Sequence, residues 1–221
     1  MSRWAAADER PHPGAATEEW TFEWWSPDGR VGGVTGYRLV GAADAWYWWG
    51  LVRPDHPLLH ITEFEITRRA DPMIAKAQAM WAEFTCEAPF EQWTLGNETY
   101  AVYLDDPADA LDRAYGDAVP IASDLEWYAT GEATPIVHGY EQYGALHGLV
   151  ELLDGPVELV ELPAHRTHRW SPGPLAPVER ASAFAHLGLR APFRFPDGSH
   201  IDLVLGADGW RARPAPPMSL R

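Results

Sequence analysis

The sequence feature that most constrains the fold is the alternation of apolar and polar residues from Ile136 to Trp170. We expect a strand over residues 136–153, a turn at Asp154-Gly155 and a return strand that ends in a polar and aromatic cluster over residues 165–170. Successive side chains of a strand point to opposite faces, so this alternation gives each strand one apolar face. The stretch therefore predicts a long β-hairpin.

The same alternation recurs along the rest of the chain. Trp20, Phe22 and Trp24 alternate with polar residues, and Asp-Gly pairs at 28, 154, 197 and 208 provide turn chemistry between short apolar runs. Gly96-Asn97 has the same character and predicts a further turn. Many short strands joined by such turns are typical of an all-β sandwich or barrel, which is the fold class that we expect.

The central hairpin carries a motif that resembles a known family. The run Tyr140-Glu141-Gln142-x-Gly144-x-x-x-Gly148, followed by His165-Arg166-x-His168-x-Trp170, resembles the AttH-type, carotenoid 1,2-hydratase-like family of lipocalin-like proteins. Members of that family have Arg-Asp-His-Ser-Trp-Gly on the return strand, and this chain keeps only Arg166, His168 and Trp170 of those six positions. The resemblance implies a β-barrel or sandwich made of two packed lipocalin-like halves.

Composition along the chain suggests where those halves lie. Residues 1–17 are rich in Ala, Pro, Gly and charge without any period, so we expect a disordered segment. We place the boundary at Val119-Pro120, giving a first lipocalin-like half over 18–120, a second over 121–214 and a tail over 215–221.

Charge and composition exclude several functional classes. The formal net charge of -15 repels phosphate groups, which argues against nucleic acid and anionic membranes as partners. The single cysteine, Cys86, cannot form an internal disulfide, the N-terminus has no apolar signal-peptide core, and no apolar run is long enough to insert in a membrane. We therefore expect a cytoplasmic protein, and the sequence leaves its oligomeric state open.

The inward face of the central hairpin provides the candidate catalytic residues. Alternation places His138, Tyr140 and Gln142 on the apolar face of the first strand, and Arg166, His168 and Trp170 together on one face of the second. One interpretation is a polar plug that closes a barrel end, and the other is a set of proton donors at the bottom of a pocket. His165 and His168 point to opposite faces, so we expect no metal.

Twelve tryptophans suggest what such a pocket would be made of. Trp24, Trp48 and Trp170 are the candidate substrate-binding residues, because aromatic faces pack on apolar ligands and stabilise cations. His168 is the candidate proton donor, with Arg166, Tyr140, Gln142 and His138 as its partners. The carboxylates of Asp124 and Glu126 alternate with apolar residues and are expected to face water.

These residues lead to a functional hypothesis and two rivals. We expect a cofactor-independent cyclase, isomerase or hydratase that acts on a lipophilic isoprenoid or polyketide-type molecule. Thr167 replaces the Asp of the resembling family, which favours cyclisation, isomerisation or simple binding over hydration. The alternative is a non-catalytic, lipocalin-like carrier of a hydrophobic metabolite, and a purely structural module would instead have a packed barrel without a cavity.

Overall fold

The regular structure of the chain is almost entirely β-strand. The computed structural model describes residues 4–175 and 186–212, without the side chains of 186–188. The strands are β1 (Thr17–Trp25), β2 (Gly32–Val40), β3 (Asp44–Val52), β4 (Leu58–Thr67), β5 (Ile74–Ala77), β6 (Met80–Ala88), β7 (Gln92–Leu104), β8 (Ala118–Ala129), β9 (Thr134–Ile136), β10 (Gly139–Glu151), β11 (Val157–Ser171), β12 (His186–Arg194), β13 (His200–Gly206) and β14 (Gly209–Ala212). Two 3₁₀ helices, η1 (Ala6–Glu9) and η2 (Pro107–Leu111), complete the assignment.

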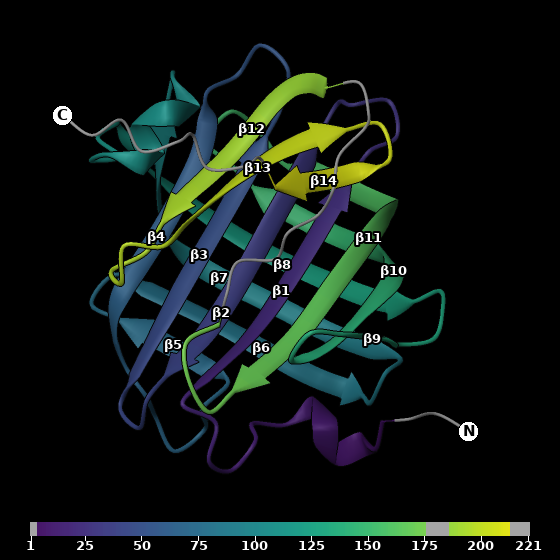
Figure 1. Ribbon diagram of the computed structural model, residues 1–221. Helices are drawn as coiled ribbons and strands as arrows, with labels where there is room; N and C mark the ends of the chain where they lie inside the picture. Colours follow the sequence, from purple (N-terminus) through teal and green to yellow (C-terminus); the bar gives the residue numbers. More distant parts are fainter. Residues whose placement is uncertain (1–3, 176–185, 213–221) are drawn as a thin grey trace, which may run out of the picture.

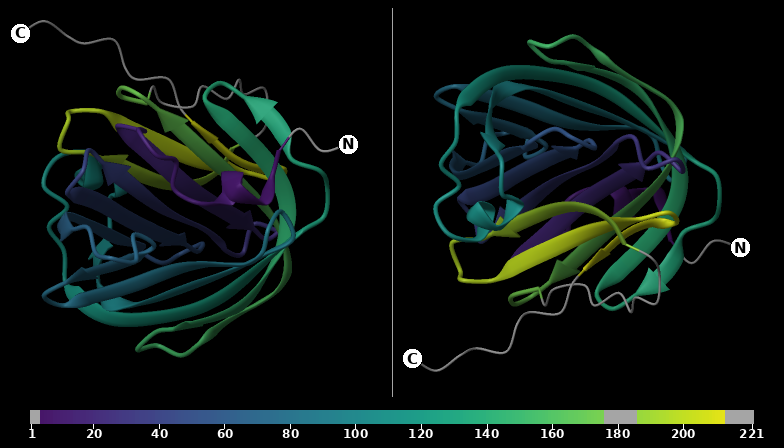
Figure 2. Two further views of the ribbon diagram at one scale, coloured as in Figure 1. Left: turned by 90° about the horizontal axis from the view of Figure 1, so that it is seen from below. Right: turned by 90° about the horizontal axis from the view of Figure 1, so that it is seen from above.

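The larger sheet closes into a barrel (Figures 1 and 2). Antiparallel pairing runs in the order β4-β3-β2-β1-β11-β10-β8-β7, and an additional pairing of β4 with β7 closes the ring. β6 pairs with the first part of β7 and β5 with β6, while β9 pairs with β10. The expected all-β, lipocalin-like architecture is confirmed. No helix among residues 4–175 and 186–212 has both the length and the apolar character needed to cross a membrane.

The second sheet covers one side of this barrel. Strands β12, β13 and β14 form a three-stranded antiparallel sheet that lies over the outer face of β1 to β4 in Figure 1. The side chains buried there with Trp48 are Phe193 of β12, Phe195 just after this strand, Leu205 of β13 and Trp210 of β14. The outer face of β3 is therefore apolar like its inner face, which explains why the run AWYWWGLV carries aromatic residues on both faces of the strand.

Aromatic side chains fill the interior of the barrel. Trp20, Phe22 and Trp24 of β1 meet Trp93 and Trp127 from the opposite wall, and each of these residues is no more than 1% exposed. Glycines make room for the rings that lie flat on the sheet, since a Cβ on Gly144 would lie 2.3 Å from the indole of Trp127. Close packing of this kind leaves the interior of the described barrel filled with side chains.

The N-terminal segment corrects one expectation. Residues 4–16 are ordered, and η1 lies below the ends of β1 and β11 in Figure 1, so the prediction of a disordered segment over 1–17 is wrong for the described part. Glu9 of this segment is only 2% exposed as a whole residue. Composition misled the prediction because this segment is ordered by contacts with distant residues and not by a local period.

The expected boundary near residue 120 falls inside a strand. β8 pairs with β7 from Ala118 to Tyr128, so one continuous ladder joins the residues on both sides of Val119-Pro120. Strands before and after the boundary share the same ring, and the described residues show no second barrel. The expected tail over 215–221 lies outside the described residues.

One local turn prediction differs from the structure and another is confirmed. Gly96-Asn97 lies within β7, because both residues pair with β6 and with β8 in a continuous ladder. The turn before β7 instead contains Phe90, whose φ is 62°. The hairpin expected at Pro196-Asp197-Gly198 is confirmed between β12 and β13. Tertiary pairing thus overrides a local turn signal when both flanking segments have partners.

Candidate functional site

Four of the five candidate catalytic residues meet at one end of the barrel. β10 and β11 pair with Tyr140 opposite His168 and Gln142 opposite Arg166, and all four side chains point inward. Gln142 accepts hydrogen bonds from Arg166 at 3.1 Å and 2.6 Å, and the hydroxyl of Tyr140 lies 3.0 Å from Nδ1 of His168. We call this end of the barrel the plug end.

The central member of the plug end is Glu9, which the sequence did not single out. Its two carboxylate oxygens accept hydrogen bonds from Nη1 and Nη2 of Arg166 at 2.9 Å and 2.6 Å. Tyr140 donates to Glu9 at 2.7 Å, and the backbone N–H of Phe90 donates at 2.7 Å. Burial alone would raise the pKa of Glu9, but the hydrogen bonds and charge of Arg166 hold the pKa of this carboxyl below its ordinary value.

A second buried carboxylate, Glu18 at the start of β1, holds the candidate proton donor. Nε2 of His168 lies 2.7 Å from Oε1 of Glu18, and Nδ1 of His12 lies 2.8 Å from the same oxygen. The His168 side chain is 0% exposed, and this burial lowers its pKa against the opposing effect of Glu18. Trp20 stacks on one side of His168, with ring centroids 4.4 Å apart. His168 is therefore enclosed by Glu18, Trp20 and their neighbours.

Trp170 lies at the outer rim of the same end. It is half-buried, and the ring of His12 stacks on it at 3.8 Å with an interplanar angle of 11°. Trp4 of the N-terminal segment lies against both Trp170 and Tyr140. The aromatic face offered to a ligand in the sequence prediction is thus occupied by protein side chains.

His138 lies outside this network, contrary to the prediction from alternation. It is exposed, and its φ of 65° places it in a tight turn between β9 and β10. The strand expected to begin at Ile136 begins at Gly139, so the alternation that holds for Tyr140 and Gln142 does not extend back to His138. Its carbonyl caps the end of β11 by accepting from the N–H of Trp170.

Trp24 and Trp48 do not line a ligand pocket. Trp24 is buried in the interior core, whereas Trp48 is buried between the barrel and the outer sheet. The two residues come from opposite faces of the same barrel wall. Trp48 borders a hollow of only about 40 Å³, too small for a lipophilic molecule. Both tryptophans serve packing.

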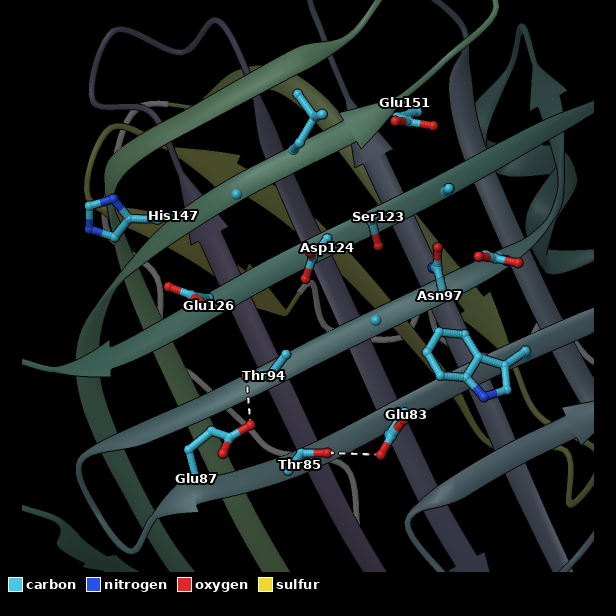
Figure 3. A pocket seen from close by; sticks show the side chains of 16 residues that line it. Glu83, Thr85, Glu87, Thr94, Asn97, Ser123, Asp124, Glu126, His147 and Glu151 are labelled. Atoms are coloured by element: carbon cyan, nitrogen blue, oxygen red, sulfur yellow. Dashed lines mark hydrogen bonds between the residues drawn. The ribbon is translucent and has the colours of Figure 1, made fainter.

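A large hollow lies on the outer face of β6, β7, β8 and β10 as a trough, which Figure 3 shows from outside the barrel. Its volume is about 840 Å³, and we call it the acidic trough. Asp124 and Glu126 face outward into it, as the sequence predicted. Carboxylates from all four strands line the trough: Glu83, Glu87, Glu98, Asp124, Glu126 and Glu151.

A second hollow, which we call the far-end hollow, continues the trough at the end of these strands opposite to the plug end. Its volume is about 690 Å³, and it shares Trp81, Glu98, Ala122 and Glu151 with the acidic trough. Most of its lining side chains are apolar, among them Tyr100 and Leu153, which are 59% and 72% exposed, and Lys76, Gln78 and Thr99 also line it. A mainly apolar hollow therefore opens directly into an acidic one.

Comparison with known proteins assigns a family without a function. The model of a domain of unknown function, DUF7064, matches residues 5–207. The chain belongs to the DUF7064 family. No curated protein matches it. The resemblance of its central hairpin to AttH-type proteins stays a prediction.

The sequence of this DUF7064 chain gave no local signal for Glu9, His12 or Glu18. They lie in or next to the segment that was predicted to be disordered from its composition. Glu9 is separated from its partner Arg166 by 157 residues in the sequence. One general signal did exist: a buried arginine needs a carboxylate partner, because an isolated buried charge is very costly. That rule requires an acidic partner for Arg166 but does not select it among 32 acidic residues.

Proposed function

We propose that this DUF7064 chain is a non-catalytic protein that binds a lipophilic small molecule in the far-end hollow. The observation that carries the proposal is the position of this hollow relative to the candidate proton donor. His168 is fully buried at the plug end, while the apolar hollow lies at the opposite end of β6, β8 and β10. A molecule bound there has no contact with His168.

The lining of the hollow indicates which molecules fit. Tyr100 and Leu153 offer exposed apolar surface, and a volume of about 690 Å³ is in the range of small-molecule sites. The shared residues Glu98 and Glu151 place carboxylates at the border with the acidic trough. Lys76 also lines the hollow, but these two carboxylates outnumber it. A lipophile with a neutral or cationic head group is therefore favoured over one with a carboxylate, because like charges repel.

Three ten-carbon probes test this proposal: decanol, decylammonium and decanoate, titrated calorimetrically into the full-length protein below their aggregation concentrations. Decanol and decylammonium are expected to bind, with decanoate at least about tenfold weaker, a difference of about 1.4 kcal/mol. The preference against decanoate should shrink in high salt, because salt screens exposed charges.

Variants locate the site. Leu153→Ser and Tyr100→Ser change exposed residues, so folding is retained, and each is expected to weaken decanol binding about fivefold or more. Val160→Ser is the matched control, because Val160 is 68% exposed and lies outside both hollows. Absence of binding by all three probes, or equal binding by the Leu153, Tyr100 and Val160 variants, would refute the proposal.

An enzymatic function is the second candidate, favoured by one observation. A continuous series of hydrogen bonds runs from the buried plug end to the partly exposed ring of His12. It passes through Glu9, Tyr140, His168, Glu18 and His12 in that order. Clusters of buried titratable groups with shifted pKa values are frequent at catalytic sites. Such a cyclase, isomerase or hydratase would protonate an isoprenoid or polyketide-type substrate without a cofactor.

Mass spectrometry separates the two candidates. The protein is incubated with a lipid extract in oxygen-18 water, beside a sample that contains His168→Ala. A compound retained at unchanged mass and retention time supports the binding function, whereas a product that His168→Ala does not form supports the enzyme.

The expected cytoplasmic location is also a proposal, which cell fractionation with an antibody tests.

A further inference from the structure

The strongest unassigned cluster of ligating atoms lies at the plug end and is independent of the far-end hollow. Nδ1 of His12, a carboxylate oxygen of Glu18 and Nε2 of His168 all lie within 4.8 Å of one another. We propose that His12, Glu18 and His168 bind a divalent transition-metal ion of the zinc type.

The ligand types suit such an ion. Neutral imidazole nitrogens and a carboxylate form common zinc sites, and three protein ligands leave one position of a tetrahedral ion for water. Hard cations such as Mg²⁺ and Ca²⁺ prefer oxygen ligands throughout, which two of these three residues do not provide.

A neighbouring group orients the ring of His168 as the partners of metal-binding histidines do. Its remaining ring nitrogen lies 3.0 Å from the hydroxyl of Tyr140, and metal-ligating histidines almost always direct the second ring nitrogen to an oxygen in this way. The remaining ring nitrogen of His12 makes no hydrogen bond to the described residues, and the nearest carboxylate oxygen, of Asp8, lies 3.5 Å from it. Stacking against Trp20 and Trp170 fixes the planes of the two rings.

The count of hydrogen-bond donors calls for a proton or a metal ion between Glu18 and His168. Tyr140 has one hydroxyl proton and donates it to the carboxylate of Glu9, so its oxygen accepts the Nδ1 proton of His168. A singly protonated ring then turns the lone pair of Nε2 toward Glu18 at 2.7 Å. Two lone pairs at this distance require a proton, on the ring or on the carboxyl group, or a metal ion between them.

Access and geometry also allow an ion to enter. The His12 side chain is 20% exposed, and a hollow of about 510 Å³ borders both His12 and Glu18. Zinc ligands at about 2.0–2.2 Å from a tetrahedral ion stand about 3.3 Å apart. The present separations of 2.7 Å and 2.8 Å must therefore widen by about 0.5 Å. The His12 ring can move because His12 precedes β1 and belongs to no strand, whereas the separation of Glu18 from His168 must widen by rotation of the Glu18 side chain.

Cobalt and zinc test the site directly. Full-length protein, freed of any tag histidines and treated with a chelator, is titrated with Co²⁺ and followed by visible absorption, and with Zn²⁺ in a calorimeter. We expect one equivalent of each ion, with the intense visible bands of a four-coordinate cobalt site. Saturating zinc at a hundred times its Kd should raise the free energy of unfolding by about 2.7 kcal/mol.

Matched histidine variants decide the outcome. His12→Ala is expected to weaken zinc binding at least a hundredfold, whereas His56→Ala, which changes an exposed turn residue, should bind like the wild type. His12→Gln, which can keep a hydrogen bond to Glu18, serves if His12→Ala fails to fold. The absence of stoichiometric binding by the wild type, or wild-type affinity in the folded His12 variants, would overturn the metal site and leave a shared proton in its place.

Discussion

The buried ion pair between Glu9 and Arg166 makes a strong prediction about stability. The two side chains are each only 1% exposed, and Glu9→Gln removes the negative charge while keeping the shape of the side chain. Arg166 then retains its bonds to Gln142 and its position 4.8 Å over the ring of Trp127, but no carboxylate. Removing one partner of a buried pair typically costs about 3–5 kcal/mol, because the other charge stays uncompensated.

We expect Glu9→Gln to lower the free energy of unfolding by about 3 kcal/mol, near the lower end of that range, because Gln142 and the aromatic ring still stabilise the guanidinium. In urea denaturation followed by circular dichroism, this loss shifts the midpoint down by about 1 M at an m-value of about 3 kcal/mol/M. Glu158→Gln is the control, since Glu158 is exposed, and it should change stability by less than about 0.5 kcal/mol.

A double-mutant cycle separates the pair from its neighbours. Arg166→Met removes the other charge, so the combined variant should cost clearly less than the sum of the two single variants. The reasoning would be refuted if Glu9→Gln cost less than about 1 kcal/mol at an unchanged m-value, or if the two single costs simply added.

Two further predictions concern other buried groups. The charges of Arg38 and Arg169 overcome the effect of burial and lower the pKa of Glu19 from 4.5 to about 2, so the stability that ionised Glu19 contributes is complete above about pH 4.5 and is lost as the pH falls toward 2. Glu19→Gln should therefore flatten the acid limb of a stability curve measured between those pH values. Gly144→Ala should destabilise the barrel by about 1–3 kcal/mol in thermal unfolding, because the new methyl group would meet the ring of Trp127, whereas Gly173→Ala, with no atom within 4 Å, should be close to neutral.

Local periodicity predicted the fold class and the inward residues of the central hairpin. Tyr140 and Gln142 face Arg166 and His168 because strand pairing preserves the alternation that the sequence displays. The same rule failed at His138, where the backbone leaves the extended conformation. Alternation therefore held only as far as the strand did, and the start of the strand was not visible in the sequence.

Which residues come together at the candidate site depends on contacts between residues far apart in the sequence. Glu9 and Glu18 reach Arg166 and His168 only after the chain has closed its ring, and no local pattern links residues so far apart in sequence. The excess of tryptophan was compatible with either a pocket or a core. Gly33 and Gly144 let the rings of Trp24 and Trp127 lie flat against the sheet. This packing shows that these tryptophans belong to the core.

The closure of the barrel also has a consequence for synthesis on the ribosome. β1 pairs with β2 on one edge and with β11 on the other, so its second edge stays open until residue 171 has been translated. Until then, Glu9 and Glu18 lack Arg166 and His168, and the aromatic face of β1 lacks one of its neighbouring strands. The nascent chain thus exposes an apolar strand edge for most of its translation. Such an edge can be bound by chaperones and promotes aggregation. A ribosome stalled before codon 157 would hold a nascent chain that lacks β11 and cannot close the barrel.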